Sequence, residues 1–448
     1  MNNLQKKDLK YIWHPCSQMK DYEELPPIVI EKGEGVFLYD TEGHSYLDAI
    51  SSWWASLLGH NHKRIKGAIN EQINKLEHIM LANFSHEPAI ELAEKIVAKT
   101  PDRLEKVFFA SDGASSVEVA LKLSFQYFQE VGKPQKTKFA SLSNSYHGDT
   151  LGALAVSDLG IYRDVFNPIL CDTIQIEGPD CYRCQFGLNR ENCQAECFKK
   201  LEETFDEYHE KLASIIVEPI VQGAGGMMIY SPVYLKKLRQ LCDKYDVLLI
   251  DDEIAMGMGR TGKLFACEHA GISPDIMTIS KGITAGTLPL SLTVISDKIY
   301  DAFYDDYTKG RSFLHSHTYS GNPVACAVAC ETLDIFEEEN ILEKNKEKSE
   351  ILKAKIEEYL LDLPQVGDFR HIGILGAVEL VKDTKRKEPF NWKDRVGFEI
   401  YKNALRNGLI LRPLGDIIYF MPAFIINEEE IEFMVKTARK SIKEYFES

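Results

Sequence analysis

The chain has 448 residues, and 52 lysines and arginines against 68 aspartates and glutamates give it a formal net charge of −16. With 44% hydrophobic and 27% charged residues, it has the usage of a globular protein with a large core. The acidic balance argues against a general binder of nucleic acid or anionic membranes, since both need a positive field.

The first 50 residues predict short strands at 28–30 and 35–39, followed by a turn at 41–43. Apolar residues at helical spacing then predict helices over 63–77 and 90–98. No apolar run approaches the roughly 18 residues of a membrane span. The N-terminal decapeptide has no apolar stretch behind it, so we expect a cytoplasmic protein without a secretory signal.

From residue 107 onwards, short apolar runs alternate with helical patterns, which indicates a mostly parallel sheet covered on both faces. The predicted strands are 107–110, 213–217, 247–250 and 276–279, and the predicted helices are 117–128, 234–245 and 324–337. Ligands of such folds bind beyond the carboxyl ends of the strands. We therefore expect three regions: residues 1–60 contributing to a small domain, a large domain over 61–330, and a C-terminal α+β small domain over 331–448.

Two residues at predicted strand ends carry chemistry. Lys281 follows the 276–279 run, where a lysine of lowered pKa can bond covalently to a carbonyl cofactor. Asp252 follows the 247–250 run, where a carboxylate can pair with the protonated pyridine nitrogen of pyridoxal phosphate (PLP). A solvated lysine and a capping acid are the ordinary alternatives, but the two residues together are more informative than either alone.

A small-residue turn over 111–116 lies between a predicted strand and a predicted helix. Small residues let backbone N–H groups approach a phosphate at a helix N-terminus. Tyr146, in the sequence Tyr-His-Gly, offers an aromatic face for a cofactor ring. Either segment alone is also compatible with an ordinary turn.

Four longer motifs resemble the class III PLP-dependent aminotransferases. They are IDDEIAMGMGRTG over 250–262, SKGITAG over 280–286, EPIVQG over 218–223 and TYSGNP over 318–323. The resemblance runs over nearly the whole chain. It implies PLP-dependent transferase fold type I, the aspartate-aminotransferase-like fold, with a large α/β domain and a smaller α+β domain, in a homodimer with shared active sites.

The resemblance also implies cofactor-binding roles. Lys281 would hold PLP covalently and move the proton, and Asp252 would keep the pyridine nitrogen protonated. Gly113 and Ala114 would donate backbone N–H groups to the phosphate, and Tyr146 would lie against the ring. From the partner subunit, His317 and Thr318 would complete the phosphate site.

Further motifs resemble the group within this class that acts on 8-amino-7-oxononanoate in biotin synthesis. They are WHPCSQM over 13–19, SSWW over 51–54, YHGDT over 146–150, FACEH over 265–269 and RPLG over 412–415. In that group, Arg412 would pair with the distal carboxylate of the substrate, and Trp53 with Trp54 would wall its chain. Ser316 and Tyr419 would line the same cavity. A terminal-amine aminotransferase, of the ornithine, 4-aminobutyrate or polyamine type, is the alternative.

Cys16 stands where this group usually has an aromatic residue at the substrate entrance. The amino donor therefore stays open between S-adenosylmethionine and lysine, with a slight preference for lysine. The phosphate turn also departs from the usual pattern, because Asp112 adds a negative charge near the expected phosphate.

Four of the ten cysteines, Cys181, Cys184, Cys193 and Cys197, form a C-x₂-C-x₈-C-x₃-C pattern in a polar segment. Four thiolates at this spacing can bind a structural zinc ion. Reduced thiols in a surface loop are the favoured interpretation, and we assign no metal ligand from the sequence.

Overall fold

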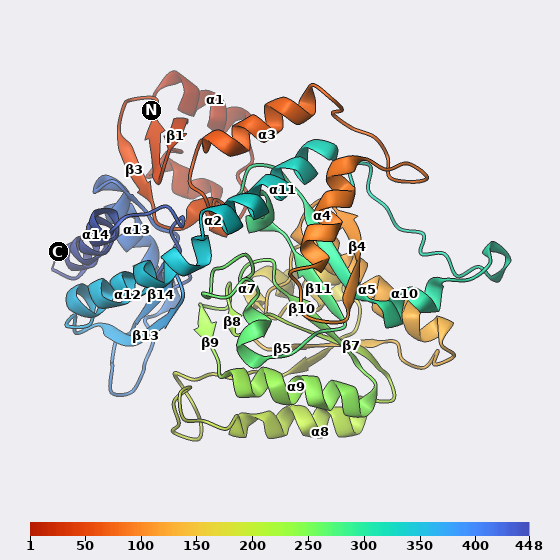
Figure 1. Cartoon of the computed structure of the whole chain (residues 1–448). Coiled ribbons are helices and arrows are strands. Elements are labelled where there is room, and N and C mark those ends of the chain that lie inside the picture. Colours follow the sequence, from red (N-terminus) through yellow and green to blue (C-terminus); the bar gives the residue numbers. More distant parts are fainter. Residues whose placement is uncertain (448) are drawn as a thin grey trace.

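The computed structural model describes residues 1–447, and a twisted seven-stranded sheet forms its centre (Figure 1). In spatial order the strands are β4 (Leu104–Ala110), β12 (Ser291–Ser296), β11 (Ile276–Ile279), β10 (Leu248–Asp252), β7 (Leu212–Val217), β5 (Lys138–Leu142) and β6 (Ile174–Ile176). Only β12 runs antiparallel to its neighbours. Every residue of β7, β10 and β11 is buried, as expected for strands covered on both faces.

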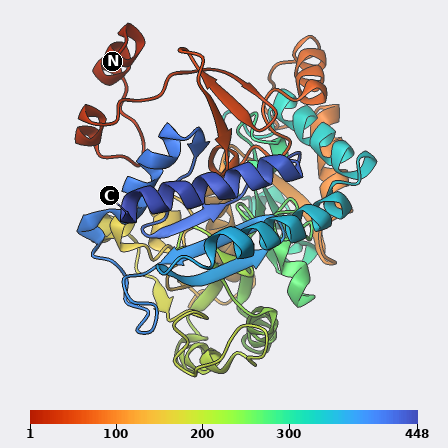
Figure 2. The ribbon, with the colours of Figure 1, turned by 90° about the vertical axis from the view of Figure 1, so that its left-hand side faces the viewer.

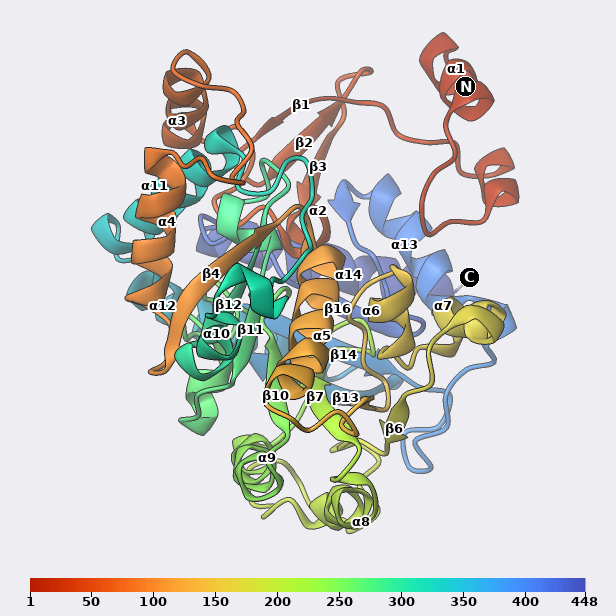
Figure 3. The same cartoon turned by 90° about the vertical axis from the view of Figure 1, so that its right-hand side faces the viewer.

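Helices cover this sheet on both sides. Helix α5 (Gly113–Glu130) packs across β7, β11 and β12, and Figure 3 shows it in front of the strands. Helix α11 (Pro323–Glu338) packs against α3 (Lys63–Ile73) and α4 (Glu87–Val97). Helices α8 (Lys199–Tyr208) and α9 (Pro232–Tyr245) lie together at the lower edge of the view in Figure 1.

The C-terminal part forms a separate layer around a three-stranded antiparallel sheet. Its strands are β13 (Val366–Ile372), β14 (Leu375–Leu380) and β16 (Ile417–Phe420), and its helices are α12 (Ile341–Leu360), α13 (Val396–Arg406) and α14 (Glu428–Phe446). Helices α12 and α14 contact each other and run side by side in Figure 2. The fold is therefore the expected α/β unit with a smaller α+β part.

The N-terminal strands join this C-terminal part. Strands β1 (Ile30–Glu34), β2 (Phe37–Asp40) and β3 (Ser45–Asp48) form an antiparallel meander. Strand β3 also pairs in parallel with β15 (Leu409–Ile410). This pairing supports the proposal that residues 1–60 contribute to a small domain built mainly from residues 331–448.

Other elements complete the chain. They are α1 (Asn3–Tyr11), α2 (Ser51–Trp54), α6 (Leu151–Ala155), α7 (Gly160–Arg163), α10 (Asp297–Phe303), β8 (Val221–Gln222) and β9 (Met228–Ile229), with seven short 3₁₀ helices among the described residues. Over residues 1–447, no helix is long and apolar enough to cross a membrane.

Candidate active site

Lys281 follows strand β11 at the start of a short 3₁₀ helix, Lys281–Thr284. Its φ of 44° is left-handed, an uncommon conformation for a non-glycine residue that is often found at functional sites. Its Nζ atom lies 5.1 Å from the centre of the Trp54 ring. Burial lowers the pKa of Lys281, against the opposing charges of Asp252 and Glu218. A lysine in this position is closer to the neutral, nucleophilic form than a solvated one.

Asp252, the last residue of β10, is buried and held on both carboxylate oxygens. His147 Nδ1 lies 2.6 Å from Oδ2, while the Ile254 N–H donates to Oδ1 at 3.1 Å and the Thr278 hydroxyl at 3.3 Å. The Nε2 atom of His147 is buried without a hydrogen-bond partner within residues 1–447. His147 belongs to the YHGDT motif over 146–150, but the sequence predicted no role for it.

Glu218 positions the backbone that carries Tyr146. Its buried carboxylate accepts the N–H of Tyr146 at 3.1 Å and that of Gly223 at 2.8 Å. Burial, with the charge of Asp252 adding to it, raises the pKa of Glu218 to about 7. Burial also raises the pKa of Tyr146, whose ring lies 5.6 Å from that of Tyr162. Glu218 and Tyr162 are further residues for which the sequence predicted no site role.

The first turn of α5 has free backbone N–H groups that could bind an anion. The Asp112 side chain accepts the Ser115 N–H at 3.0 Å, and its carbonyl accepts the Ser116 N–H at 3.1 Å. Within the described chain, the N–H groups of Gly113 and Ala114 are thus the open donors of this 18-residue helix. Gly148 packs so tightly that a Cβ there would lie 2.6 Å from the Cβ of Ala114. The departure at Asp112 is therefore a helix cap that leaves the two predicted donors free.

An aromatic wall leads away from Lys281. Trp54 is buried, and its Nε1 donates to the Tyr419 hydroxyl at 3.0 Å. Trp53 is more exposed, and the Arg412 guanidinium lies 3.8 Å from the centre of its ring. Both tryptophans have left-handed φ values, 70° for Trp53 and 71° for Trp54. Because of this backbone conformation, the adjacent residues Trp54 and Trp53 lie at opposite ends of the wall, Trp54 beside Lys281 and Trp53 beside Arg412.

Arg412 makes no ion pair within the part of the chain that the structure describes. Its positive charge lowers the pKa of Tyr162, although burial raises that pKa overall. A guanidinium that stacks on Trp53 and gives one hydrogen bond to Tyr162 keeps its other donors available for a planar anion.

Not every predicted residue joins this cluster. Cys16 is exposed but close enough to Tyr146 and Tyr162 to affect the pKa of both. Ser316 and Thr318 are exposed in the segment between α10 and α11. His317 contacts its own segment, through Ser320 Oγ at 3.2 Å and the His315 ring at 5.0 Å. Within one chain, these contacts do not connect 316–318 with the helix α5 donors.

The geometry fits PLP. The open donors of Gly113 and Ala114 suit a phosphate, the carboxylate of Asp252 suits a protonated pyridine nitrogen, and Lys281 suits an aldehyde. All three lie at the same edge of the sheet: Asp252 ends β10, Lys281 follows β11, and Gly113 begins the helix that follows β4. The fold and site therefore define a PLP-dependent aminotransferase.

The model of the aminotransferase class-III family matches residues 18–442, and the chain belongs to this family. Over 97% of its length it is 44% identical to the adenosylmethionine-8-amino-7-oxononanoate aminotransferase of Geobacter sulfurreducens, of which 96% is covered. The crystal structure of the enzyme of that name from Methanocaldococcus jannaschii has a TM-score of 0.93 and 37% identity, with 98% of each chain covered.

A second solved structure, the omega transaminase from Pseudomonas jessenii in complex with PMP, has a TM-score of 0.95 and 33% identity. The alignment covers 100% of this chain and 99% of the chain of that structure. The similarity of the fold thus extends to a protein named for a different activity. Overall fold similarity alone does not select the substrate.

Proposed function

We propose that this enzyme transfers an amino group to 8-amino-7-oxononanoate, giving 7,8-diaminononanoate for biotin synthesis. The names and identity of the curated relatives support this reaction. The structural observation that carries it is the unpaired Arg412 guanidinium stacked on Trp53, at the far end of an aromatic wall that begins beside Lys281. A long keto acid needs one reacting end and one distal cation, and the wall joins the two.

Each residue has a defined task in this proposal. Bound PLP supplies an electron sink that lets an amino group and a proton be exchanged at the substrate carbon. Lys281 holds the cofactor before substrate arrives and then carries the proton on its Nζ atom. Asp252, fixed by His147, keeps the pyridine nitrogen positive. Gly113 and Ala114 bind the phosphate through their backbone, and Tyr146 lies against the ring.

The substrate chain lies along the aromatic wall. Trp53, Trp54 and Tyr419 exclude water from its methylene groups, while Arg412 receives the carboxylate. An aminotransferase for a terminal amine such as ornithine, 4-aminobutyrate or a polyamine is the alternative. Trp53 with Arg412 argues against a polyamine, because a dication gains nothing from an unpaired guanidinium.

The amino donor is S-adenosylmethionine or lysine. Both enter past Cys16, which lies near Tyr146 and Tyr162. The small side chain at Cys16 leaves an entrance without the stacking face that an adenine ring uses well. This arrangement favours lysine slightly over S-adenosylmethionine.

The active enzyme is a homodimer in the cytoplasm. Between α10 and α11 the chain projects outward (teal, right of Figure 1) and exposes Tyr304, Tyr307 and Leu314. A second copy covers these apolar side chains in the proposed dimer and brings its own His317 and Thr318 to the phosphate site. Ser316 approaches the substrate from the same segment.

A half-reaction assay tests the proposal. Purified holoenzyme is mixed with each candidate donor, and the near-visible absorbance of the lysine-bound cofactor is followed. The true amino donor must remove this absorbance. The aminated enzyme is then given 8-amino-7-oxononanoate, which must restore the absorbance and form 7,8-diaminononanoate. If ornithine or 4-aminobutyrate bleaches the enzyme and the keto acid restores nothing, the alternative is correct.

A further inference from the structure

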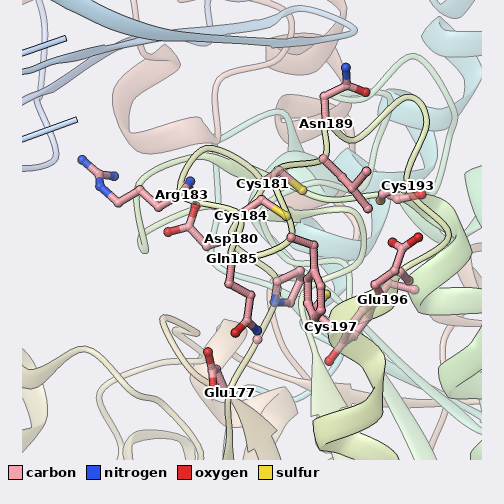
Figure 4. A pocket seen from close by; sticks show the side chains of 17 residues that line it. Glu177, Asp180, Cys181, Arg183, Cys184, Gln185, Asn189, Cys193, Glu196 and Cys197 are labelled. Carbon is pink, nitrogen blue, oxygen red and sulfur yellow. Dashed lines mark hydrogen bonds between the residues drawn. The ribbon is translucent and has the colours of Figure 1, made fainter. Parts of the chain in front are cut away.

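The segment between β6 and α8 brings four cysteines to one pocket. Cys181, Cys184, Cys193 and Cys197 are all partly buried and line a cavity of about 100 Å³ (Figure 4). Apart from a 3₁₀ turn at Glu196–Phe198, this segment has no regular secondary structure. Irregular segments of this length are uncommon in compact domains unless something else orders them or they serve a function.

All four thiols lie on the lining of one pocket, in two close pairs along the chain, Cys181 with Cys184 and Cys193 with Cys197. A cation bound there would convert the thiols to thiolates, and their protons would leave on binding.

A buried hydroxyl points to the same place. Tyr234 of α9 is 1% exposed and lines the pocket, and its Oη has no hydrogen-bond partner within residues 1–447. Cys197 lines the same pocket as Tyr234. A buried hydroxyl normally has a partner. A thiolate at Cys197 would accept this hydrogen bond, whereas a thiol accepts only weakly.

The sulfur atoms line the pocket without yet meeting. A tetrahedral zinc site with Zn–S bonds of about 2.3 Å places its sulfurs about 3.8 Å apart. Across residues 1–447, the one group of three or more possible ligand atoms within 4.8 Å of one another is Asp251, Glu253 and Cys267, elsewhere in the core. The irregular segment must therefore rearrange to bring the four sulfur atoms together when it binds the ion, which couples binding to ordering.

Ordering this segment would affect the contact between the two parts of the fold. The C-x₂-C turn carries Tyr182 and Arg183 between its two thiols. Arg183 donates to Glu379 of β14 at 2.6 Å, and Lys387 donates to the Tyr182 carbonyl at 2.5 Å. A cation bound by Cys181 and Cys184, at the two ends of this turn, would hold Tyr182 and Arg183 in place. It would therefore stabilise the two hydrogen bonds that join the segment to the C-terminal part of the fold.

We propose that Cys181, Cys184, Cys193 and Cys197 bind one structural Zn²⁺ ion, with Tyr234 donating to the Cys197 thiolate. Four S–H bonds give way to four Zn–S bonds, and the protons leave to solvent, so no oxidant or reductant is required. Zinc suits four soft ligands with no open position, and such a site is structural rather than catalytic. Arg190 lines a neighbouring pocket together with Cys181, and its positive charge would offset part of the negative charge of the complex.

The test measures metal in the full-length holoenzyme. The protein is produced in zinc-supplemented medium, freed of loose metal by gel filtration and analysed by plasma mass spectrometry. We expect about one zinc per chain in the wild type. Cys184→Ser and Cys193→Ser should each lose it. Cys171→Ser, a change at an exposed cysteine near the segment, should retain it.

Two further measurements keep the test decisive if the serine variants fail to fold. Cobalt-loaded wild type should show the intense visible absorption of tetrahedral cobalt thiolate. Tyr234→Phe should keep full zinc content but release it to a chelator several-fold faster. The cofactor absorbance of each sample reports separately that the active site is intact, so a failed zinc site is distinguishable from a wrong enzymatic assignment.

Three results would overturn the proposal. The first is wild-type enzyme without stoichiometric zinc, whose four thiols stay reactive after zinc is added. The second is iron with acid-labile sulfide, which would mean that the same thiolates hold a cluster. The third is a zinc content that the serine variants leave unchanged, which would place the ion elsewhere.

Discussion

The Nδ1 atom of His147 lies 2.6 Å from the Asp252 carboxylate, across 105 residues of sequence. Both side chains are buried. The His147 backbone N–H donates to Ser157 Oγ at 2.9 Å, which fixes the peptide that carries the ring. His147, in the connection that follows β5, therefore holds the Asp252 carboxylate at the end of β10 in the position from which it would contact the cofactor nitrogen.

Removing this neighbour should slow amino transfer. A hydrogen bond to a charged group contributes about 1.5–3 kcal/mol, so His147→Ala should slow the single-turnover half-reaction roughly 10- to 150-fold. The bound cofactor spectrum should also shift, a change that a merely structural loss would not produce. His44→Ala, which removes an exposed histidine 3.0 Å from Asp40, is the matched control and should leave the rate unchanged. Equal rates in both variants would exclude the positioning role.

The cofactor linkage should depend on one lysine. Lys281→Ala should abolish the near-visible absorbance of lysine-bound PLP and nearly all turnover, while exposed Lys236→Ala should change neither. Borohydride reduction of the wild type followed by peptide mass mapping should place the pyridoxyl group on Lys281. A label on any other lysine would refute the assignment.

The sequence placed Lys281 and Asp252 at strand ends because both follow short apolar runs, and the structure ends β11 and β10 close to the predicted positions. It could not predict His147 or Glu218 as site residues. Their positions depend on how separate strand connections meet at the sheet edge, and a single sequence does not contain that distance. The Arg412–Trp53 stack likewise joins residues 359 positions apart. It depends on the left-handed backbone conformation of Trp53 and Trp54, which no local sequence pattern predicts.

Shared phosphate sites should allow complementation between defective chains. A Lys281→Ala chain mixed with a chain carrying Thr318→Ala and His317→Ala should form heterodimers with one intact site. We expect partial recovery of turnover on mixing, relative to either variant alone. If mixed chains form heterodimers and recover no turnover, each phosphate site is built within one chain.

Recognition of the distal carboxylate should depend on Arg412. Arg412→Ala should cost about 2–5 kcal/mol, the usual effect of removing one partner of a partly dry charged pair. The loss should appear in the half-reaction with the keto acid and much less with the donor. Arg406→Ala, at an exposed arginine of α13, serves as the control. Equal slowing of both half-reactions would show that Arg412 serves the donor or the fold.

Asp251 and Glu253 form a buried acid pair that should make stability depend on pH. Neither Asp251 oxygen has a hydrogen-bond partner among residues 1–447. Burial and the neighbouring Glu253 raise the pKa of Asp251 well above its usual range, and burial raises the pKa of Glu253 from 4.5 to about 7. The folded state thus binds protons more tightly than the unfolded chain.

The sign of this effect follows from linkage. For a raised folded-state pKa, stability is fully present below the unfolded value near 4.5 and is lost as the pH rises through about 7. Glu253 alone would then account for a decrease of about 3 kcal/mol in the free energy of unfolding across that window. Asp251→Asn removes one of the two competing charges, so urea unfolding should show it more stable than wild type at pH 8 and little different at pH 5. Glu210→Gln, at an exposed acid, should follow the wild type at both pH values. A constant difference between Asp251→Asn and wild type at both pH values would mean that the pair does not titrate in this window.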